Sequence, residues 1–293
     1  MSYDGQALAA NLNVPMSLAI DNSGGLYISD TYDYVVSALV ADADSSIGIV
    51  EPDVVSAASY ATGFLAPESL ASLYGQNLAI GAESAASLPL PTSLAGVRVA
   101  VVDGTLIPRT APLLYADKNQ VNFEIPAGTV PGPAFVQVTL SDGSVTATPI
   151  EIANVSPGIF TLNDFGLAAA WVLRVSADGT QSLEPVYEVQ NGAVIPKPID
   201  LGPVTDRVYL EIYGTGIRGA SGVNDSISVT MGGVSAAVSY AGPQGILVGV
   251  DQVNAEIPRS LAGAGEISVV LTVGPSYNPS YAVRSNLVHI SIL

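Results

Sequence analysis

The chain of 293 residues contains no cysteine and a single histidine, and both shortages narrow the chemistry open to it. Without cysteine there is no disulfide, no thiolate zinc site and no cysteine nucleophile. Because His289 is the sole histidine, a metal centre lacks a second imidazole, and a Ser-His-Asp triad would have to recruit a residue of the last strand. The sequence therefore predicts that the protein is not an enzyme and has neither a cofactor nor a metal site.

Basic residues are also scarce, with nine Lys and Arg against 26 Asp and Glu and a net charge of −17. A chain this acidic is repelled by nucleic acid and by anionic membrane surfaces, so neither is a predicted partner. No apolar run reaches the length of about 20 residues that a membrane helix needs. The N-terminus does not resemble a signal peptide, because Asp4 and Gln6 stand where basic residues belong. An exported protein would need a signal outside this chain.

The residues that are abundant indicate an ordered β protein. Hydrophobic residues make up 48% of the chain and charged residues 12%, which excludes disorder. The 29 glycines and 20 prolines indicate many turns, and the periodic runs are rich in Val, Ile, Thr and Tyr. The mean hydropathy of +0.43 is high for a chain without a membrane helix. It indicates either cores rich in Ala and Val or apolar surface left for a partner.

One heptapeptide occurs twice and reveals a duplication. Gln120–Pro126 reads QVNFEIP and Gln252–Pro258 reads QVNAEIP, so the copies differ only at Phe123 and Ala255. Alternation of apolar and polar residues is typical of a strand with one buried face, and proline suits the end of a strand. The pattern predicts six core positions: Val121, Phe123, Ile125, Val253, Ala255 and Ile257. It also predicts that another large side chain fills the second core beside Ala255.

Short periodic runs surround each copy, separated by turn signals such as Asp103-Gly104 and Asp142-Gly143. About seven short strands with turns at this spacing are typical of an immunoglobulin-like sandwich. The sequence predicts an all-β fold: two tandem immunoglobulin-like β-sandwich domains with an N-terminal β-hairpin segment. We expect the hairpin and a linker in residues 1–50, the first sandwich in 51–160 and the second in 161–293.

The N-terminal segment has the pattern of a hairpin, because Leu18 and Ile20 alternate before a Gly-Gly turn and Leu26 and Ile28 after it. Residues 15–31 follow the order P-x-x-L-A-x-D-x-x-G-x-L-Y-I-x-D-T and resemble one NHL repeat, the blade unit of a β-propeller. A single blade cannot bury its own face. We expect it to pack on the rest of this chain or on another chain, or to remain partly unfolded.

Ten short motifs are distributed over residues 54–293: Ala57–Tyr60, Ala66–Leu70, Leu73–Gly75, Asn77–Leu78, Leu88–Thr92, Ala111–Tyr115, Gln120–Asn122, Pro157–Phe160, Tyr213–Gly216 and Gln252–Asn254. Together they resemble the Solibacter-type C-terminal domain family. The resemblance implies an exported β-sandwich tail behind an extracellular module, and it implies no catalytic residue. The chain departs from the family pattern in having one blade and in longer loops at Leu183–Pro203 and Asn278–Arg284.

Seven acidic residues are candidates for a ligand or catalytic role: Asp21, Asp30, Asp33, Asp42, Asp44, Glu124 and Glu256. The spacing of Asp42 and Asp44 suits a Ca²⁺ loop, but the rest of that loop is missing, so a solvated linker is favoured. For the aspartates of the blade, turns and hydrogen bonds are favoured over Ca²⁺. Glu124 and Glu256 belong to different predicted domains, which leaves a glycosidase pair unsupported. Gly214-Thr-Gly216 is too short for a dinucleotide fingerprint.

Tyrosine is the most abundant aromatic residue, with thirteen copies. Four of them recur at matching positions of the two halves: Tyr74 with Tyr213, and Tyr115 with Tyr240. Tyrosines can stack on sugars, but recurrence in both halves favours a packing role.

The function expected from these features is that of an extracellular or cell-surface protein with a structural or adhesive role. A hairpin too small to fold alone could add a strand to a neighbouring subunit and build a filament, which makes self-association the expected partnership. The alternative is a carbohydrate-binding module or an accessory domain of a larger secreted enzyme, with a polysaccharide as partner.

Overall fold

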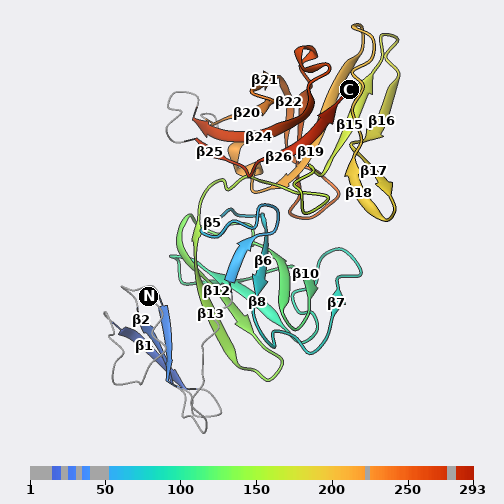
Figure 1. Ribbon diagram of the computed structural model, residues 1–293. Coiled ribbons are helices and arrows are strands. Elements are labelled where there is room, and N and C mark those ends of the chain that lie inside the picture. Colours follow the sequence, from blue (N-terminus) through green and yellow to red (C-terminus); the bar gives the residue numbers. More distant parts are fainter. Residues whose placement is uncertain (1–14, 21–25, 31–34, 40–52, 222–224, 276–281) are drawn as a thin grey trace. The chain divides into compact units, whose positions relative to one another are not determined.

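A computed structural model describes residues 15–20, 26–30, 35–39, 53–221, 225–275 and 282–293 (Figure 1). The chain forms two compact units, one of residues 1–54 and 72–151 and the other of residues 55–71 and 152–293. Strands are the main regular elements of the described residues, and the helical elements described there are two short 3-10 helices at Arg218–Ser221 and Arg259–Leu261. None of their helices is long and apolar enough to cross a bilayer. The predicted all-β fold of tandem immunoglobulin-like sandwiches is confirmed.

The first sandwich consists of two five-stranded sheets. One sheet has the order β4 (Asp53–Ser56), β6 (Leu70–Tyr74), β11 (Gln120–Glu124), β10 (Leu113–Ala116), β7 (Glu83–Ser84). The other has the order β5 (Phe64–Leu65), β13 (Val145–Ile152), β12 (Gly132–Thr139), β8 (Arg98–Val102), β9 (Pro108–Thr110). A turn in which Ser69 N–H donates to Ala66 O separates β5 from β6, and the two strands join different sheets.

The second sandwich also has two sheets. The larger has the order β16 (Gln181–Pro185), β15 (Ala170–Val175), β19 (Arg207–Thr215), β23 (Asp251–Glu256), β22 (Val238–Pro243), with β14 (Gly158–Ile159) paired to β19. The other has the order β21 (Val234–Ala236), β20 (Asp225–Met231), β24 (Gly265–Pro275), β25 (Val283–Arg284), with β26 (Val288–Ile292) paired to β24. The long segment 183–203 forms a separate hairpin of β17 (Tyr187–Gln190) and β18 (Ala193–Pro196).

The repeated heptapeptide occupies equivalent places in the two sandwiches, in β11 and in β23. All six predicted core positions are buried. A register shift precedes Tyr115, which lies opposite Asn122, and an equivalent shift precedes Tyr240, which lies opposite Asn254. Leu210 and Val238 are the strand partners of Ala255. The duplication therefore extends from the sequence to the pairing of the strands and to their bulges.

The N-terminal strands form a sheet of their own, with the order β1 (Pro15–Ile20), β2 (Leu26–Asp30), β3 (Val35–Leu39). Leu18 pairs with Ile28 and Ile20 with Leu26, which confirms the predicted hairpin, and β3 adds a third strand. The predicted turn and linker aspartates Asp21, Asp33, Asp42 and Asp44 lie outside the described residues.

The Gly214-Thr-Gly216 segment has a packing role at the end of β19. A Cβ atom at Gly214 would clash with the carbonyl oxygen of Gly158, and one at Gly216 with that of Ser156. Gly216 also has a φ of +74°, a conformation that L side chains rarely adopt. Between the glycines, the buried hydroxyl of Thr215 donates to Gly249 O (2.6 Å) and accepts from Leu70 N (2.8 Å). The two glycines therefore allow the end of β19 to pack directly against the backbone of residues 156–158.

A buried carboxylate, that of Asp103, anchors the turns of the first unit. It accepts hydrogen bonds from Thr105 N (3.0 Å), Thr105 Oγ1 (2.5 Å), Val130 N (2.7 Å) and Arg109 Nη1 (2.5 Å). Burial alone would raise the pKa of Asp103, but these donors outweigh burial and hold the pKa well below its usual range. Sequence analysis identified only the turn at Asp103-Gly104. Thr105 and Arg109 lie two and six residues away, and Val130 comes from a loop 27 residues away.

We expect the stability of the first unit to depend on pH through Asp103. Because folding lowers this pKa, the ionised carboxylate stabilises the fold above about pH 4, and this contribution is lost as the pH falls toward the folded-state value. Asp103→Asn should therefore cost about 1.5–3 kcal/mol near neutral pH and progressively less in acid. Urea unfolding of both proteins between neutral pH and pH 2, followed by circular dichroism, measures the difference. A difference that does not shrink in acid would contradict this role.

Candidate functional site

The outer face of the larger sheet in the second unit carries a group of exposed and half-buried aromatic residues. Along β15, β19 and β23 the residues alternate, and those directed inward are buried, such as Val172, Leu210 and Val253. The outward positions include a group that we call the aromatic face: Trp171, Tyr209, Glu211, Tyr213, Tyr240 and Asn254. These residues come from four adjacent strands, β15, β19, β23 and β22.

The register aligns four members of the aromatic face in one line across the sheet. Trp171 lies opposite Glu211, Glu211 opposite Asn254, and Asn254 opposite Tyr240. Tyr209 and Tyr213 are two residues before and after Glu211 and therefore share its face. Trp171 is 37% exposed and Tyr240 43% exposed, while Tyr209, Glu211 and Tyr213 are half-buried. The face is thus accessible to a ligand.

Glu211 is a half-buried carboxylate for which the described part of the chain supplies no hydrogen-bond or ion-pair partner. Burial raises its pKa. Burial also raises the pKa of the neighbouring Tyr213, and the charge of Glu211 raises it further. A half-buried acid between aromatic rings is costly unless something donates to it.

The other charges near the aromatic face are already paired. Arg207 Nη2 lies 2.7 Å from Glu256 Oε2, and its guanidinium lies over the ring of Tyr209, 5.1 Å from the centroid. The side-chain amide of Gln252 donates to Asn254 Oδ1 (2.8 Å), as Gln120 does to Asn122 (2.7 Å) in the first copy. The Gln and Asn of the repeated motif are thus outward residues that bond to each other.

The four recurring tyrosines have different surroundings. Tyr115 and Tyr74 in the first unit and Tyr213 in the second are half-buried. Tyr115 donates its hydroxyl to Asp117 Oδ2 (2.7 Å), and Tyr240 donates to Pro243 O (2.5 Å). The hydroxyl bond fixes Tyr240 along its strand, yet much of its ring remains exposed.

The aromatic face has no counterpart in the first sandwich. Because Tyr74 matches Tyr213, Ser72 takes the place of Glu211 and Leu70 that of Tyr209, and both Ser72 and Leu70 are buried. The aromatic face was not predicted from the sequence, because the tyrosines considered there were those that recur in both halves of the chain. The alternation of Tyr209, Glu211 and Tyr213 in the run RVYLEIY was the available signal.

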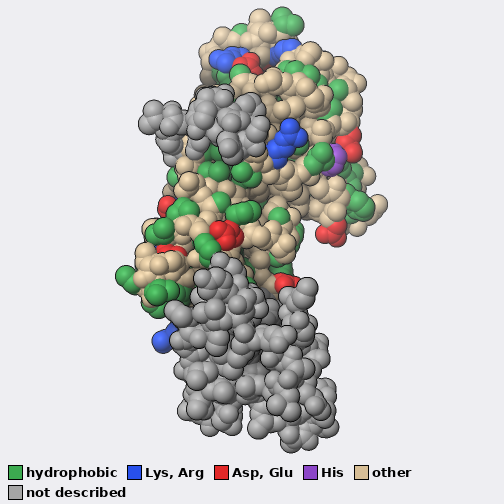
Figure 2. Space-filling model, turned by 90° about the vertical axis from the view of Figure 1, so that its left-hand side faces the viewer, with side chains coloured by type: hydrophobic (Ala, Val, Ile, Leu, Met, Phe, Trp, Pro, Cys, Tyr) green, Lys and Arg blue, Asp and Glu red, His purple; other side chains and the backbone are tan. Residues whose placement is uncertain are grey.

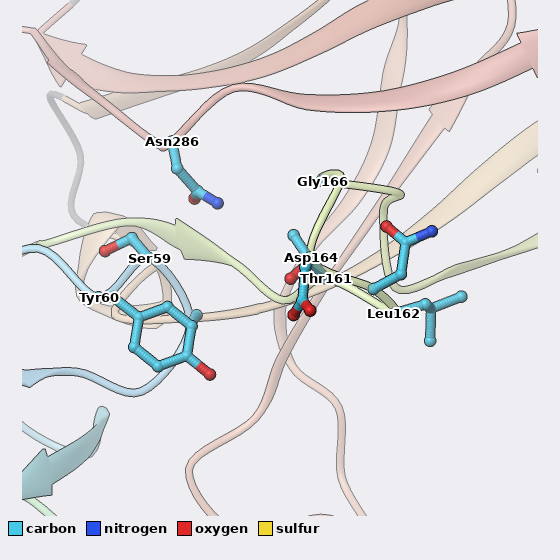
Figure 3. Close-up of a pocket in the computed structure, with 9 residues that line it drawn as sticks. Ser59, Tyr60, Thr161, Leu162, Asp164, Gly166 and Asn286 are labelled. Atoms are coloured by element: carbon cyan, nitrogen blue, oxygen red, sulfur yellow. The ribbon is translucent and has the colours of Figure 1, made fainter. Parts of the chain in front are cut away.

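A second feature of this unit is an open pocket of about 500 Å³ lined by Ala58, Ser59, Tyr60, Thr161, Leu162, Asn163, Asp164, Gly166 and Asn286 (Figure 3). Ser59 and Tyr60 line one side, and Thr161 and Asp164 face them. Asn286 bonds both polar groups of Ile159 (2.8 and 2.9 Å). Asn163 Oδ1 accepts from Phe165 N and Leu167 N. Since both amides are engaged in holding loops, the lining is mainly structural.

The histidine and the acidic residues that the sequence offered as candidate catalysts form no catalytic arrangement in the described part of the chain. His289 lies in β26 with Nδ1 3.9 Å from Glu266 Oε1, opposite Ser268 in the sheet register. Glu256 is paired with Arg207. Within the described ranges, no group of three or more His, Cys, Asp or Glu side chains is placed to hold a metal ion.

Large hydrophobic side chains are exposed at several separate places, including Phe165, Val204 and Leu106. On the coloured part of the face shown in Figure 2, hydrophobic side chains form several groups among polar and backbone atoms. Dispersed apolar residues are normal on protein surfaces.

No protein-family model matches the chain, and no curated protein sequence matches it. Solved structures that match include murine CEACAM1b, 13% identical, covering 78% of this chain and 96% of that one, with a TM-score of 0.18. Tandem titin immunoglobulin domains match at 9% identity, 83% and 97% coverage and a TM-score of 0.22. The first two immunoglobulin domains of DIP-gamma match at 10% identity, 83% and 97% coverage and a TM-score of 0.20. Such scores carry no functional argument, and the fold assignment rests on the strand pairing above.

Proposed function

We propose that this chain is a structural or adhesive protein of the cell exterior that associates with further copies of itself by β-strand addition. The observation that carries the proposal is a set of unprotected sheet edges. The N-terminal strands β1, β2 and β3 pair only with one another among the described strands, so the outer edges of β1 and β3 are open. Open edges are templates for pairing with another chain.

One common protection of such edges, lysine, is missing from the described strands. Natural β proteins often place lysine on edge strands to prevent association. The only lysines here, Lys118 and Lys197, lie outside the strands. The edge strand β16 is five residues long, and its Leu183 is 59% exposed. We assign β16 as the acceptor edge and the N-terminal sheet as the donor, a head-to-tail contact that propagates without closing.

The test is the oligomeric state of the purified full chain by light scattering and electron microscopy. We expect large assemblies, and we expect both Leu183→Lys and a chain without residues 1–50 to be monomeric. The control is Val204→Lys, because Val204 is 91% exposed but lies in a loop, and this variant should still assemble. Circular dichroism verifies that each variant is folded. A monomeric full chain, or assemblies that survive both changes, would overturn the proposal.

A further inference from the structure

The aromatic face brings together the groups that recognise sugars. Trp171 and Tyr240 offer exposed ring surface at the two ends of the line, and apolar sugar faces stack on such rings. Glu211 and Asn254 lie between them in the register and supply a carboxylate acceptor and an amide donor. We propose that this face binds a neutral polysaccharide. This inference rests on the adhesive role proposed above, and it names the class of ligand to which the protein would adhere.

The unpartnered carboxylate of Glu211 is the first argument for a ligand. A half-buried acid without a donor loses hydration and receives no hydrogen bond in exchange. Sugar hydroxyls are donors, and two neighbouring hydroxyls match the two oxygens of a carboxylate. A bound sugar would therefore satisfy the group that the protein itself leaves unsatisfied.

The dimensions of the line favour an extended ligand. Trp171, Glu211, Asn254 and Tyr240 lie on four successive strands, and three steps between strands span roughly 14 Å. A compact cation needs several rings around one point, as in an aromatic cage. Rings at the two ends of a line instead suit a chain of several sugar units lying across the sheet.

Charge restricts the ligand to neutral polysaccharides. The net charge of −17 and the carboxylate of Glu211 repel acidic sugars. The cation nearest in the register, Arg207, is held by Glu256 and by the ring of Tyr209, so it is not free to bind an anion. A dry protein interface would be equally unfavourable, because it would bury Glu211 without a counter-charge.

The experiment uses the full chain and soluble polysaccharides of glucose, mannose and xylose, with polygalacturonate as the anionic counterpart and choline as a compact cation. Isothermal titration calorimetry measures binding. Trp171 is the only tryptophan, so its fluorescence reports a ligand on this face directly. We expect binding to at least one neutral polymer with a change in that fluorescence, and no binding of polygalacturonate or choline.

The duplication provides a matched control. Trp171→Ala and Glu211→Ala should each weaken binding about tenfold or more, and Tyr240→Ala should weaken it by a smaller factor. Tyr115→Ala changes the equivalent tyrosine of the first copy and should bind as the parent does. Tyr60→Ala, in the pocket, should also leave binding unchanged.

The proposal is overturned if no neutral polymer binds, if choline or polygalacturonate is the preferred ligand, or if Trp171→Ala binds like the parent. Loss of binding in Tyr60→Ala alone would move the site to the pocket and likewise overturn it. Light scattering on the same samples separates the two proposals. Assembly without sugar binding contradicts only this inference, and sugar binding by a monomeric chain contradicts only the proposed assembly.

Discussion

Replacing Asp251 with alanine should destabilise the second unit by about 3–5 kcal/mol, which is the usual cost of removing one member of a buried ion pair. Asp251 is fully buried and accepts from Ile217 N (2.7 Å), Arg218 N (3.2 Å) and Arg218 Nε (2.6 Å). Burial raises its pKa, and these donors and the charge of Arg218 offset part of the rise. Alanine would leave the buried N–H of Ile217 without its acceptor and would remove the carboxylate from the largely buried guanidinium of Arg218.

Trp171 makes this loss measurable in one unit, because the only tryptophan lies in β15 of the second unit. Urea unfolding followed by its fluorescence should show an earlier transition in Asp251→Ala. Asp251→Asn keeps the shape and one acceptor oxygen, so we expect a smaller loss of about 1.5–3 kcal/mol. Asp178→Ala changes an exposed turn and should shift stability by less than about 0.5 kcal/mol. An Asp251→Ala transition that coincides with that of the parent would show that the pair contributes little.

Replacing Phe123 with alanine should cost the first unit about 3–5 kcal/mol, because the change leaves a large cavity. Phe123 is fully buried in β11, with Leu113 as its strand partner. Phe123→Leu keeps most of the volume and should cost less than about 1.5 kcal/mol. Urea unfolding followed by circular dichroism measures both. Equal losses in the two variants would mean that cavity volume does not decide the cost.

The second copy of the motif allows a reciprocal comparison. Ala255 holds the equivalent position between Leu210 and Val238, and it is fully buried. Ala255→Phe should therefore destabilise by overpacking, at a cost of about 1–3 kcal/mol. If Ala255→Phe instead stabilised the second unit, the space beside Ala255 would be empty. The prediction that another large side chain fills that space would then be wrong.

The strands of the repeated motif could be predicted from sequence because their physics is local. A strand with one buried face must alternate, so Val121, Phe123 and Ile125 identify the inner side without knowledge of any partner. The hairpin of the N-terminal segment was predictable for the same reason, since its turn and its two apolar pairs lie within a few residues.

Features that depend on distant partners could not be read from the sequence. Asp103 was recognisable only as a turn residue, although its carboxylate is held by Arg109 and by Val130 N. Asp251 showed no signal at all, because its partners Ile217 and Arg218 are more than 30 residues away. The sequence alone does not distinguish an aspartate in an exposed turn from a buried aspartate that holds distant segments together.

The sequence by itself determined that the protein is a duplicated, acidic β protein without cysteine chemistry, because composition and alternation are properties of the chain alone. Only the tertiary structure decided which outward residues become neighbours. Strand order and register bring Trp171, Glu211, Asn254 and Tyr240 into one line although they are separated by up to 83 residues in sequence. Pairing between strands fixes such proximity, and pairing is set by the packing of the whole sheet rather than by any short stretch.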